Sequence, residues 1–597
     1  MTKEDLEKLK KIGVKTPLEL ALIKPKEYED NYLYPYVLPS TQAFEAEILD
    51  IKKSPKVTRV KFYLKNINQI IYGVFFQFKK WHESVFKPGN TLYIRGEIKQ
   101  NQLIQPKPIS RINEITPIYK TNLNIRSLRA LIKKYVTLEN LSILPEKIAK
   151  NLFFMHFPQT KEHINEKNIT YALKWAEIFN YLHKLQNKKR VLPSIKIISD
   201  PAPFINSLPF KLTNDQLKVI NEIKNDISKP TQARRVVIGD VGSGKTVVML
   251  ATAFMAEKSI IMCPTSILAN QIYEEAKKFF KWKTYPTSQN EEWKITLVTQ
   301  KSKFNEEDIK NSNLLIGTHA LLYQNLPQVN VVMVDEQHRF GTNQRAQLEK
   351  LTSSGSTVPH YFQFSATPIP RTQALIMSSF VNVSLIKQLP FKKDIDTKII
   401  SKEDFKSLIA HIQSEISQGN QVVIVYPLVE ESENFSYQSI EEGKNFWLKY
   451  FDGVYITHGK DKNKEDILIE FREKGNILIT TTVIEVGISL PKLTTIVIVG
   501  AERLGLATLH QLRGRVGRYG QKGYCFLYTN DKNNKRLKAF ANTLDGFKIA
   551  ELDLEFRKSG DLLDGKAQSG ESFKYFDEVR DLHILEEVKS YILTTTA

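Results

Sequence analysis

The strongest constraint on the fold is an eight-residue stretch that matches the pattern G-x-x-x-x-G-K-[ST] at every specified position. A short, mostly apolar run at 235–238 precedes it and a longer one at 247–256 follows, so the sequence predicts a buried strand, a glycine loop and a helix. In such a loop the backbone N–H groups bind phosphate, the lysine adds charge near the β- and γ-phosphates, and the threonine hydroxyl can ligate Mg²⁺. The sequence therefore predicts a nucleotide-driven protein, with a glycine turn lacking any ligand as the alternative. The stretch consists of Gly239, Asp240, Val241, Gly242, Ser243, Gly244, Lys245 and Thr246.

Composition narrows the class of partner. The 597 residues include 85 Lys and Arg against 65 Asp and Glu, a net charge of +20 that favours a polyanion such as nucleic acid. The alternative is a solvated basic surface, as in lysine-rich proteins of AT-rich genomes. Cys263 and Cys525 lie far apart without metal-ligand spacing, which argues against a disulfide framework or a zinc site and fits a reducing cytoplasm. No signal core or membrane-length apolar run occurs, so we expect a soluble, cytoplasmic protein.

The length predicts about four domains, and the character of the chain changes along it. Residues 4–23 carry apolar residues at helical spacing, and residues 43–116 form short alternating runs typical of a compact β-barrel. Helical periodicity returns over 127–192, before a proline-marked linker. Beyond the linker, β-branched strands alternate with helices in two sets divided near Pro390. This pattern predicts two parallel sheets covered on both faces.

Aromatic residues interleave with lysines inside the expected barrel, over residues 72–81. Phe76, Phe78 and Trp81 are therefore candidate base-stacking residues of the kind that an OB-fold barrel uses. The alternative is that the phenylalanines fill the barrel core, and for Phe75 or Phe76 taken alone the core is favoured. One face of the barrel can fill the core while another stacks on bases.

Two further signals concern phosphate chemistry. Asp335 and Glu336 follow the apolar run at 331–334, where Asp335 can hold Mg²⁺ and Glu336 can polarise the attacking water. A basic segment with two glycines, 510–518, lies in the second set of strands. Its arginines Arg515 and Arg518 can supply positive charge to a phosphoryl transition state when two domains close around the nucleotide.

In this order, the segments resemble the motifs of superfamily-two helicases and translocases. Residues 210–216 resemble the adenine-reading Q motif, in which Gln216 would meet the base and Phe210 would stack nearby. Residues 264–271 and 316–322 resemble motifs Ia and Ib, 365–372 motif III, 480–488 motif V and 511–518 motif VI. The resemblance implies nucleotide contact by Gln511 and DNA contacts by Thr265, Thr318, His319 and Thr481. It implies coupling of hydrolysis to DNA by Gln337, His338, Ser365, Thr367, Glu485 and Gly487.

Within that superfamily, residues 335–341 (DEQHRFG), 427–433 (PLVEESE) and 501–506 (AERLGL) are similar to the bacterial RecG family of branch-migrating DNA helicases. The resemblance covers about residues 9–570, and the expected barrel corresponds to the family's fork-splitting wedge domain. It implies ATP and Mg²⁺ as cofactors and branched double-stranded DNA as partner. It also names single-stranded-DNA-binding protein as a candidate partner, and we expect a monomer associated with the bacterial nucleoid.

The C-terminal translocation motif of that family is matched in part. Residues 545–557 fit it, so the resemblance implies DNA contacts by Arg557 and Gln568. Where the family has R-G-P-G and T-R-Q-S-G, this chain carries Arg557-Lys558-Ser559-Gly560 and Lys566-Ala567-Gln568-Ser569-Gly570. A lysine does not reproduce the planar bidentate fork of an arginine, which puts the coupling role of this element in doubt.

We therefore predict a multidomain α/β chain that uses ATP to translocate on double-stranded DNA and remodel forks and four-way junctions. The alternatives are a transcription-repair-coupling type of translocase, an RNA helicase, and a non-catalytic nucleic-acid-binding scaffold. The expected parts are a helical lead-in (1–42), an OB-fold wedge (43–118), a helical connector (119–195), two RecA-like domains (196–388 and 389–535) and a translocation region (536–597).

Overall fold

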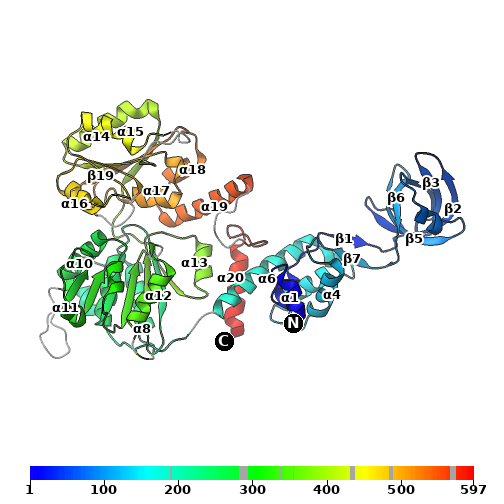
Figure 1. Cartoon of the computed structure of the whole chain (residues 1–597), viewed down its shortest axis with the longest axis horizontal. Helices are drawn as coiled ribbons and strands as arrows, with labels where there is room; N and C mark the ends of the chain where they lie inside the picture. The colour runs from blue at the N-terminus through cyan, green and yellow to red at the C-terminus, as the bar shows by residue number, and fades with distance from the viewer. Residues whose placement is uncertain are drawn as a thin grey trace. The chain divides into compact units, whose positions relative to one another are not determined.

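The computed structural model describes the chain except for residues 188–190, 281–292, 337–338, 354, 356, 430–436, 483–488, 519, 565–572 and 597, and except for the side chains of 342, 557–564 and 596. The described chain forms two compact units. One contains residues 1–184 and 571–597, and the other contains residues 185–570 (Figure 1). The expected translocation region, 536–597, is thus divided, because its last part belongs with the N-terminal unit.

The unit of residues 185–570 contains two parallel sheets. The first has the strand order β10-β11-β9-β12-β13-β8-β14, and its phosphate-loop strand β8 lies between β13 and β14. Its strands are β8 (Arg234–Gly239), β9 (Ser259–Met262), β10 (Ile295–Val298), β11 (Leu314–Gly317), β12 (Val331–Asp335), β13 (His360–Ser365) and β14 (Asn382–Ile386). Its helices are α7 (Ala202–Asn206), α8 (Asn214–Ile227), α9 (Lys245–Ala256), α10 (Ser266–Phe280), α11 (Glu306–Asn311), α12 (Thr342–Leu351) and α13 (Arg371–Met377).

The second sheet has the strand order β15-β20-β19-β16-β18-β17. Its strands are β15 (Ile395–Ile400), β16 (Gln421–Val425), β17 (Val454–Thr457), β18 (Ile477–Thr480), β19 (Leu493–Val499) and β20 (Gly523–Tyr528). Its helices are α14 (Phe405–Ser417), α15 (Ile440–Tyr450), α16 (Lys464–Lys474), α17 (Leu506–Arg513), α18 (Lys535–Ala541) and α19 (Gly546–Asp564).

Alternate residues of each strand pack into different cores, so both faces of both sheets are buried. In β12, Met333 packs into the core beneath α9, whereas Val332 and Val334 pack into the core on the opposite face. In β16, Val423 packs into one core and Ile424 packs into the core on the opposite face of the sheet. A strand that is buried on both faces needs a continuous apolar run, which is the pattern that the sequence carries. The predicted pair of two-faced parallel sheets is confirmed.

The barrel of the other unit is closed, with neighbouring strands in the order β2-β3-β4-β6-β5. A short helix, α3 (Lys80–Val85), connects β4 to β5. β7 does not extend the barrel, because it pairs antiparallel with β1. The strands are β1 (Glu27–Asp30), β2 (Gln42–Lys53), β3 (Thr58–Leu64), β4 (Gln69–Phe75), β5 (Thr91–Lys99), β6 (Gln102–Pro108) and β7 (Ile115–Ile118).

Helices make up the rest of this unit. The lead-in, expected as one helical segment over 4–23, is two short helices, because Gly13 adopts a left-handed conformation (φ +76°) between them. The helices are α1 (Lys3–Lys10), α2 (Pro17–Ala21), α4 (Ile125–Tyr135), α5 (Glu146–His156), α6 (Glu166–Gln186) and α20 (Leu582–Thr596). Among the described residues, no helix combines the length and apolarity that a membrane crossing requires.

One carboxylate on α6 accepts three backbone hydrogen bonds from the returning C-terminal segment. Glu177, on α6, accepts hydrogen bonds from the backbone N–H groups of Lys574, Tyr575 and Phe576 at 2.7–2.8 Å. The hydroxyl of Tyr575 also donates to the carbonyl of Leu22 at 2.8 Å. Segments far apart in the sequence are therefore joined within one unit.

We predict that Glu177→Ala detaches this segment, because three backbone donors lose a charged acceptor at once. Each hydrogen bond to a charged group contributes about 1.5–3 kcal/mol. Limited proteolysis should show faster cleavage near residue 574 in the variant than in the wild type. Glu139→Ala, at an exposed carboxylate of the same unit, is the control and should not change the cleavage rate. Equal cleavage of Glu177→Ala and wild type would contradict this anchoring role.

Candidate nucleotide site

A cavity of about 760 Å³ brings the predicted phosphate-handling residues of both sheets together. Phe391, in the segment between β14 and β15, also faces it, as do residues of α10. Strands of open α/β sheets present their carboxyl ends to ligands, and the cavity lies where β8 and β12 end. The predicted residues that line it are Phe210, Gln216, Val241, Gly242, Gly244, Lys245, Thr246, Asp335, Glu336, Gln511, Arg515 and Arg518.

The phosphate loop has the backbone conformation that its glycines permit. Gly242 and Gly244 both have positive φ, +79° and +78°, and Gly244 directly precedes α9. The N-terminus of α9 thus points its free N–H groups at the cavity, which suits an anion. Lys245 Nζ donates to the carbonyls of Gly239 and Asp240 at 2.9 and 3.0 Å. Burial lowers the pKa of Lys245, and the nearby carboxylates of Glu336 and Asp335 oppose that shift.

Gln216 supports the phosphate loop directly. Its Nε2 donates to the carbonyl of Ser243 at 2.9 Å, and its Oε1 accepts the backbone N–H of Thr213 at 2.8 Å in a capping box that begins α8. A β-carbon on Gly244 would lie 2.2 Å from this Nε2, so the amide fits only against a glycine. Phe210 lies exposed at the rim, with its ring edge-on to Phe279 at 5.9 Å. The adenine contacts of Gln216 and Phe210 stay predictions.

The acidic pair lies at the end of β12. Burial and the neighbouring Glu336 raise the pKa of Asp335 to about 7, although Lys245 opposes the shift. Glu336 has a positive φ of +48°, which is unusual for a residue with a side chain. Its Oε1 accepts the backbone N–H of Ala366 at 3.0 Å. The strained backbone thus directs this carboxylate along the end of the sheet toward the segment that follows β13.

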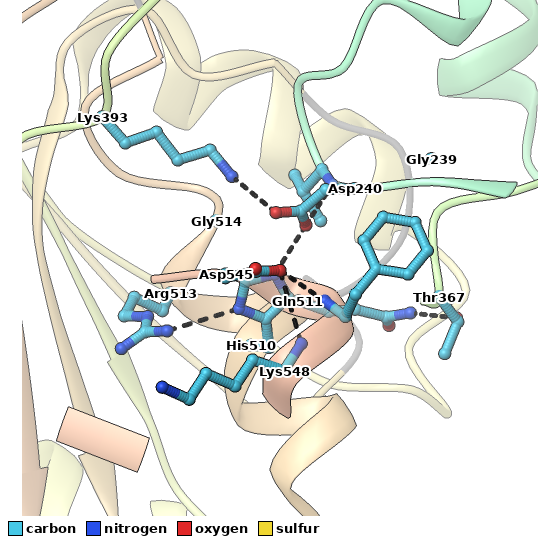
Figure 2. Close-up of polar contacts among 12 residues, drawn as sticks. Gly239, Asp240, Thr367, Lys393, His510, Gln511, Arg513, Gly514, Asp545 and Lys548 are labelled. Carbon is cyan, nitrogen blue, oxygen red and sulfur yellow. Dashed lines mark hydrogen bonds and ion pairs between the residues drawn. The ribbon is translucent and has the colours of Figure 1, made fainter. Parts of the chain in front are cut away.

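Hydrogen bonds continue from that segment to the second sheet. The hydroxyl of Ser365 accepts the backbone N–H of Thr367 at 3.1 Å. The hydroxyl of Thr367 in turn accepts Nε2 of Gln511, on α17, at 2.6 Å (Figure 2). Glu336, Thr367 and Gln511 therefore form a polar path from the predicted hydrolytic carboxylate to the helix that precedes the two arginines.

The two arginines approach the cavity from the loop after α17. Arg515 is nine-tenths buried, and Arg518 is tied to the end of α17 by a hydrogen bond from its Nε to the carbonyl of Gly514 at 3.2 Å. Both line the same cavity as Lys245. The arrangement can bind a polyphosphate between cations of two sheets and place a carboxylate beside it.

The side chain of Asp240 turns away from the cavity. Its Oδ1 lies 2.5 Å from Nε2 of His510 and its Oδ2 lies 3.5 Å from Nζ of Lys393 (Figure 2). The predicted nucleotide contact of Asp240 therefore rests on its backbone. Sequence reasoning did not identify His510, Lys393 or Phe391 as partners of the loop, because no local pattern links residues so far apart in the chain.

The structure describes only some of the residues predicted to contact DNA or to couple hydrolysis to DNA. Thr265, Thr318 and Thr481 follow the carboxyl ends of β9, β11 and β18. Thr318 is buried and accepts the backbone N–H of Ala320 at 3.4 Å, whereas His319 is exposed. Gln337, His338, Glu485, Gly487, Lys566, Ala567 and Gln568 lie outside the described residues, as do the side chains of Arg557, Lys558 and Ser559.

The barrel aromatics divide between core and surface. Phe75 is buried in the barrel core, as expected for it taken alone, but Phe76 is 57% exposed, so the core interpretation of Phe76 is wrong. β4 ends at Phe75, and its last three residues are buried, whereas Phe76 follows the strand and lies outside the core. Phe78 packs partly into the core and stacks on His82 at 5.0 Å. Trp81 is 48% exposed.

Among the described residues, no group of three or more His, Cys, Asp or Glu side chains could hold a metal ion. The acidic pair nevertheless suits a cation that is bound mainly by phosphate. Asp335 is a buried carboxyl whose pKa is raised by a second carboxyl, and a divalent cation would relieve that repulsion.

Comparisons with known proteins agree on one family. Residues 213–376 match the model described as DEAD/DEAH box helicase, and residues 403–520 match the helicase conserved C-terminal domain. The ATP-dependent DNA helicase RecG of Helicobacter pylori (strain ATCC 700392 / 26695) is 45% identical, over 97% of this chain and 96% of the relative. RecG of Thermotoga maritima is 33% identical, over 97% and 80%. A solved structure of RecG bound to a three-way DNA junction superposes with a TM-score of 0.57 at 25% identity, over 99% and 84%.

The raised pKa of Asp335 predicts how stability depends on pH in the absence of nucleotide. The folded protein retains a proton that the unfolded chain, with a pKa near 3.8, has lost, so stability should fall as pH rises from about 4 to about 7. The slope is at most about 1.4 kcal/mol per pH unit. Thermal unfolding of Asp335→Asn across this range should show a shallower loss than the wild type. Identical slopes would contradict the raised pKa.

Proposed function

Because the chain belongs to the RecG family of ATP-dependent DNA helicases, we propose that it hydrolyses ATP to move along double-stranded DNA and remodel branched DNA. The proposed substrates are stalled replication forks and four-way junctions. One observation carries the proposal: a single cavity gathers Lys245, Glu336, Arg515 and Arg518 from two sheets. Such a site is complete only while the two sheets are together, which makes hydrolysis dependent on their motion.

In the proposed reaction, ATP binds with its phosphates on the loop before α9 and next to Lys245. Glu336 orients the attacking water and accepts its proton. Arg515 and Arg518 stabilise the charge that develops on the transferred phosphoryl group. After hydrolysis and phosphate release the arginines lose their anionic partner, so the two sheets can separate and bind the next ATP.

We propose Thr246 and Asp335 as the protein groups that hold the magnesium ion of Mg-ATP. When bound, this ion neutralises charge on the β- and γ-phosphates. The proposal is supported by the position of both residues on the cavity and by the raised pKa of Asp335, which a cation would lower.

We propose that the barrel separates strands at the junction while the motor pulls the duplex. Phe76 and Trp81 offer exposed rings for stacking on an unpaired base, and Lys79 and Lys80 lie between them in sequence. Phe78, which stacks on His82, supports the surface from within. Thr265, Thr318, His319, Thr481, Arg557 and Gln568 remain proposed DNA contacts.

Three more detailed proposals rest on the family resemblance alone. The protein acts as a monomer, it encounters single-stranded-DNA-binding protein at forks, and it works on the chromosome in the bacterial cytoplasm. The rival functions differ in their nucleic acid or in their need for ATP. An RNA helicase would use 2′-hydroxyl contacts, and a scaffold would bind DNA without turnover.

Lys245→Ala and Glu336→Gln should each abolish DNA-stimulated ATP hydrolysis, measured as phosphate release. The first removes the cation beside the phosphates, and the second removes the base, whose loss costs on the order of 10²–10⁴ in rate. Lys258→Ala, at an exposed lysine of the same sheet, is the control and should hydrolyse ATP at the wild-type rate. Turnover by either site variant at the wild-type rate would refute the assignment.

The same assay distinguishes the substrates of the wild-type enzyme. ATP hydrolysis and unwinding are measured on a fork, a four-way junction, linear duplex, single-stranded DNA and single-stranded RNA at matched ionic strength, because basic proteins bind all of these in low salt. Preference for the fork and the junction supports the proposal. Equal activity on single-stranded RNA would overturn it.

Phe76→Ala with Trp81→Ala should reduce fork unwinding while ATP hydrolysis on linear duplex is unchanged. Stacking of a base on an aromatic side chain contributes about 1–3 kcal/mol. Leu49→Ala, at another exposed apolar side chain of the barrel, controls for loss of surface hydrophobicity and should unwind normally. If the double variant unwinds forks at the wild-type rate, these rings do not act as the wedge.

A further inference from the structure

We propose that Asp240 of the phosphate loop is a positioning residue whose carboxylate holds His510 across the two sheets and so transmits the state of the loop to helix α19. The inference rests on the proposed function, since it concerns how ATP hydrolysis is converted into DNA movement. Its first basis is geometry: Oδ1 of Asp240 and Nε2 of His510 are 2.5 Å apart, and both side chains are almost completely buried (Figure 2).

The surrounding groups determine which atom donates. Nη2 of Arg513 lies 3.4 Å from Nδ1 of His510, and a guanidinium can only donate, so Nδ1 accepts and Nε2 carries the proton. Burial lowers the pKa of His510, and although the hydrogen bond and charge of Asp240 oppose this shift, the charges of Arg513 and Lys393 reinforce it, so the net shift favours the neutral ring. Asp240 resists ionisation through burial, but the hydrogen bond from His510 and the charge of Lys393 outweigh that effect and lower its pKa. An ionised carboxylate thus accepts from a neutral imidazole of fixed tautomer.

The contact fixes the position of α17 relative to the loop. His510 and Gly514 lie one helical turn apart and face two consecutive loop residues, Asp240 and Val241. A β-carbon at Gly514 would lie 2.9 Å from Cβ of Val241, so the helix end and the loop are in direct contact. Arg515 and Arg518, which line the cavity, follow this helix end in the sequence.

The first residue of helix α19 packs against Asp240 and His510. A β-carbon on Gly546, its first residue, would lie 2.7 Å from Nε2 of His510, 2.7 Å from Cγ of Pro368 and 2.9 Å from Cγ of Asp240. Further along α19, Asp553 accepts the backbone N–H of Leu506, the first residue of α17, at 3.1 Å. α19 is therefore held at its start by Asp240 and His510 and along its length by α17. If the phosphate loop moves when nucleotide binds or leaves, the movement can be transmitted to α19 through these few closely packed residues.

The proposal predicts a specific loss of coupling. His510→Ala and Asp240→Ala should each lower the number of base pairs unwound per ATP hydrolysed by about tenfold or more, because a buried polar partner is left unsatisfied. The KM for ATP should change by less than about twofold, since neither side chain lines the cavity. Asp240→Asn, which keeps an oxygen acceptor for His510, should lose less than Asp240→Ala. The double variant Asp240→Ala with His510→Ala should be no worse than the poorer single variant.

The control is an exposed ion pair between the same two sheets. Lys301 and Asp466 are joined at 2.7 Å, but both are exposed, so Lys301→Ala should leave the coupling ratio unchanged. Gly546→Ala is a second, independent test, because it leaves the side chains of Asp240 and His510 unchanged. It tests the proposal even if His510→Ala or Asp240→Ala fails to fold. Its added methyl group would lie too close to His510, Pro368 and Asp240, so it would disturb the packing of α19 on this contact and should also lower the ratio.

Two results would overturn the proposal. One is an unchanged coupling ratio in His510→Ala or in a folded Gly546→Ala. The other is a raised KM for ATP with an unchanged ratio in Asp240→Ala, which would make its carboxylate a nucleotide contact. Absence of ATP hydrolysis in the wild-type protein would refute the proposed function instead, so the two failures are distinguishable.

Discussion

The motor depends on the close approach of the phosphate loop to the end of α17. Two glycines make this approach possible for different reasons. Gly244 supplies a left-handed backbone and leaves room for the amide of Gln216, whereas Gly514 has an ordinary helical backbone and is needed because Val241 lies against it. The second contact lies directly before Arg515, the first of the two arginines that follow α17 and line the cavity. The nucleotide site is thus a property of the packing between the two sheets.

The acidic end of β12 contains two features that lower the stability of the folded protein. Glu336 has a left-handed backbone at φ +48°, which is unfavourable by about 1–2 kcal/mol for a residue with a β-carbon. Asp335 beside it is a buried carboxyl with a raised pKa. Both are unfavourable in the absence of ligand, and the proposed phosphate and cation would relieve the repulsion at Asp335 and place Glu336 beside the reacting group. Strain of this kind is concentrated at functional sites, and the rest of the two-faced sheet compensates for it.

The sequence predicted the two sheets well, because burial on both faces demands continuous, mostly apolar runs such as Ser259–Met262 and Gln421–Val425. It predicted the phosphate loop because that chemistry is local. It did not predict the break at Gly13, where the backbone is left-handed, or the exposure of Phe76, which depends on the residue at which β4 ends. It also could not pair Asp240 with His510, because a contact between residues 270 positions apart leaves no local pattern.

Arg513 explains why α17 can act as one rigid element. Its guanidinium is almost fully buried, at 1% exposure, and burial lowers its pKa to about 10. It donates to the carbonyls of Phe540 and Thr543 at 3.1 and 2.7 Å and lies 3.9 Å above the Phe540 ring. A planar group with several fixed donors can satisfy these acceptors and still reach His510, whereas a lysine cannot. The buried arginine therefore joins α17 to α18 and to the segment between α18 and α19.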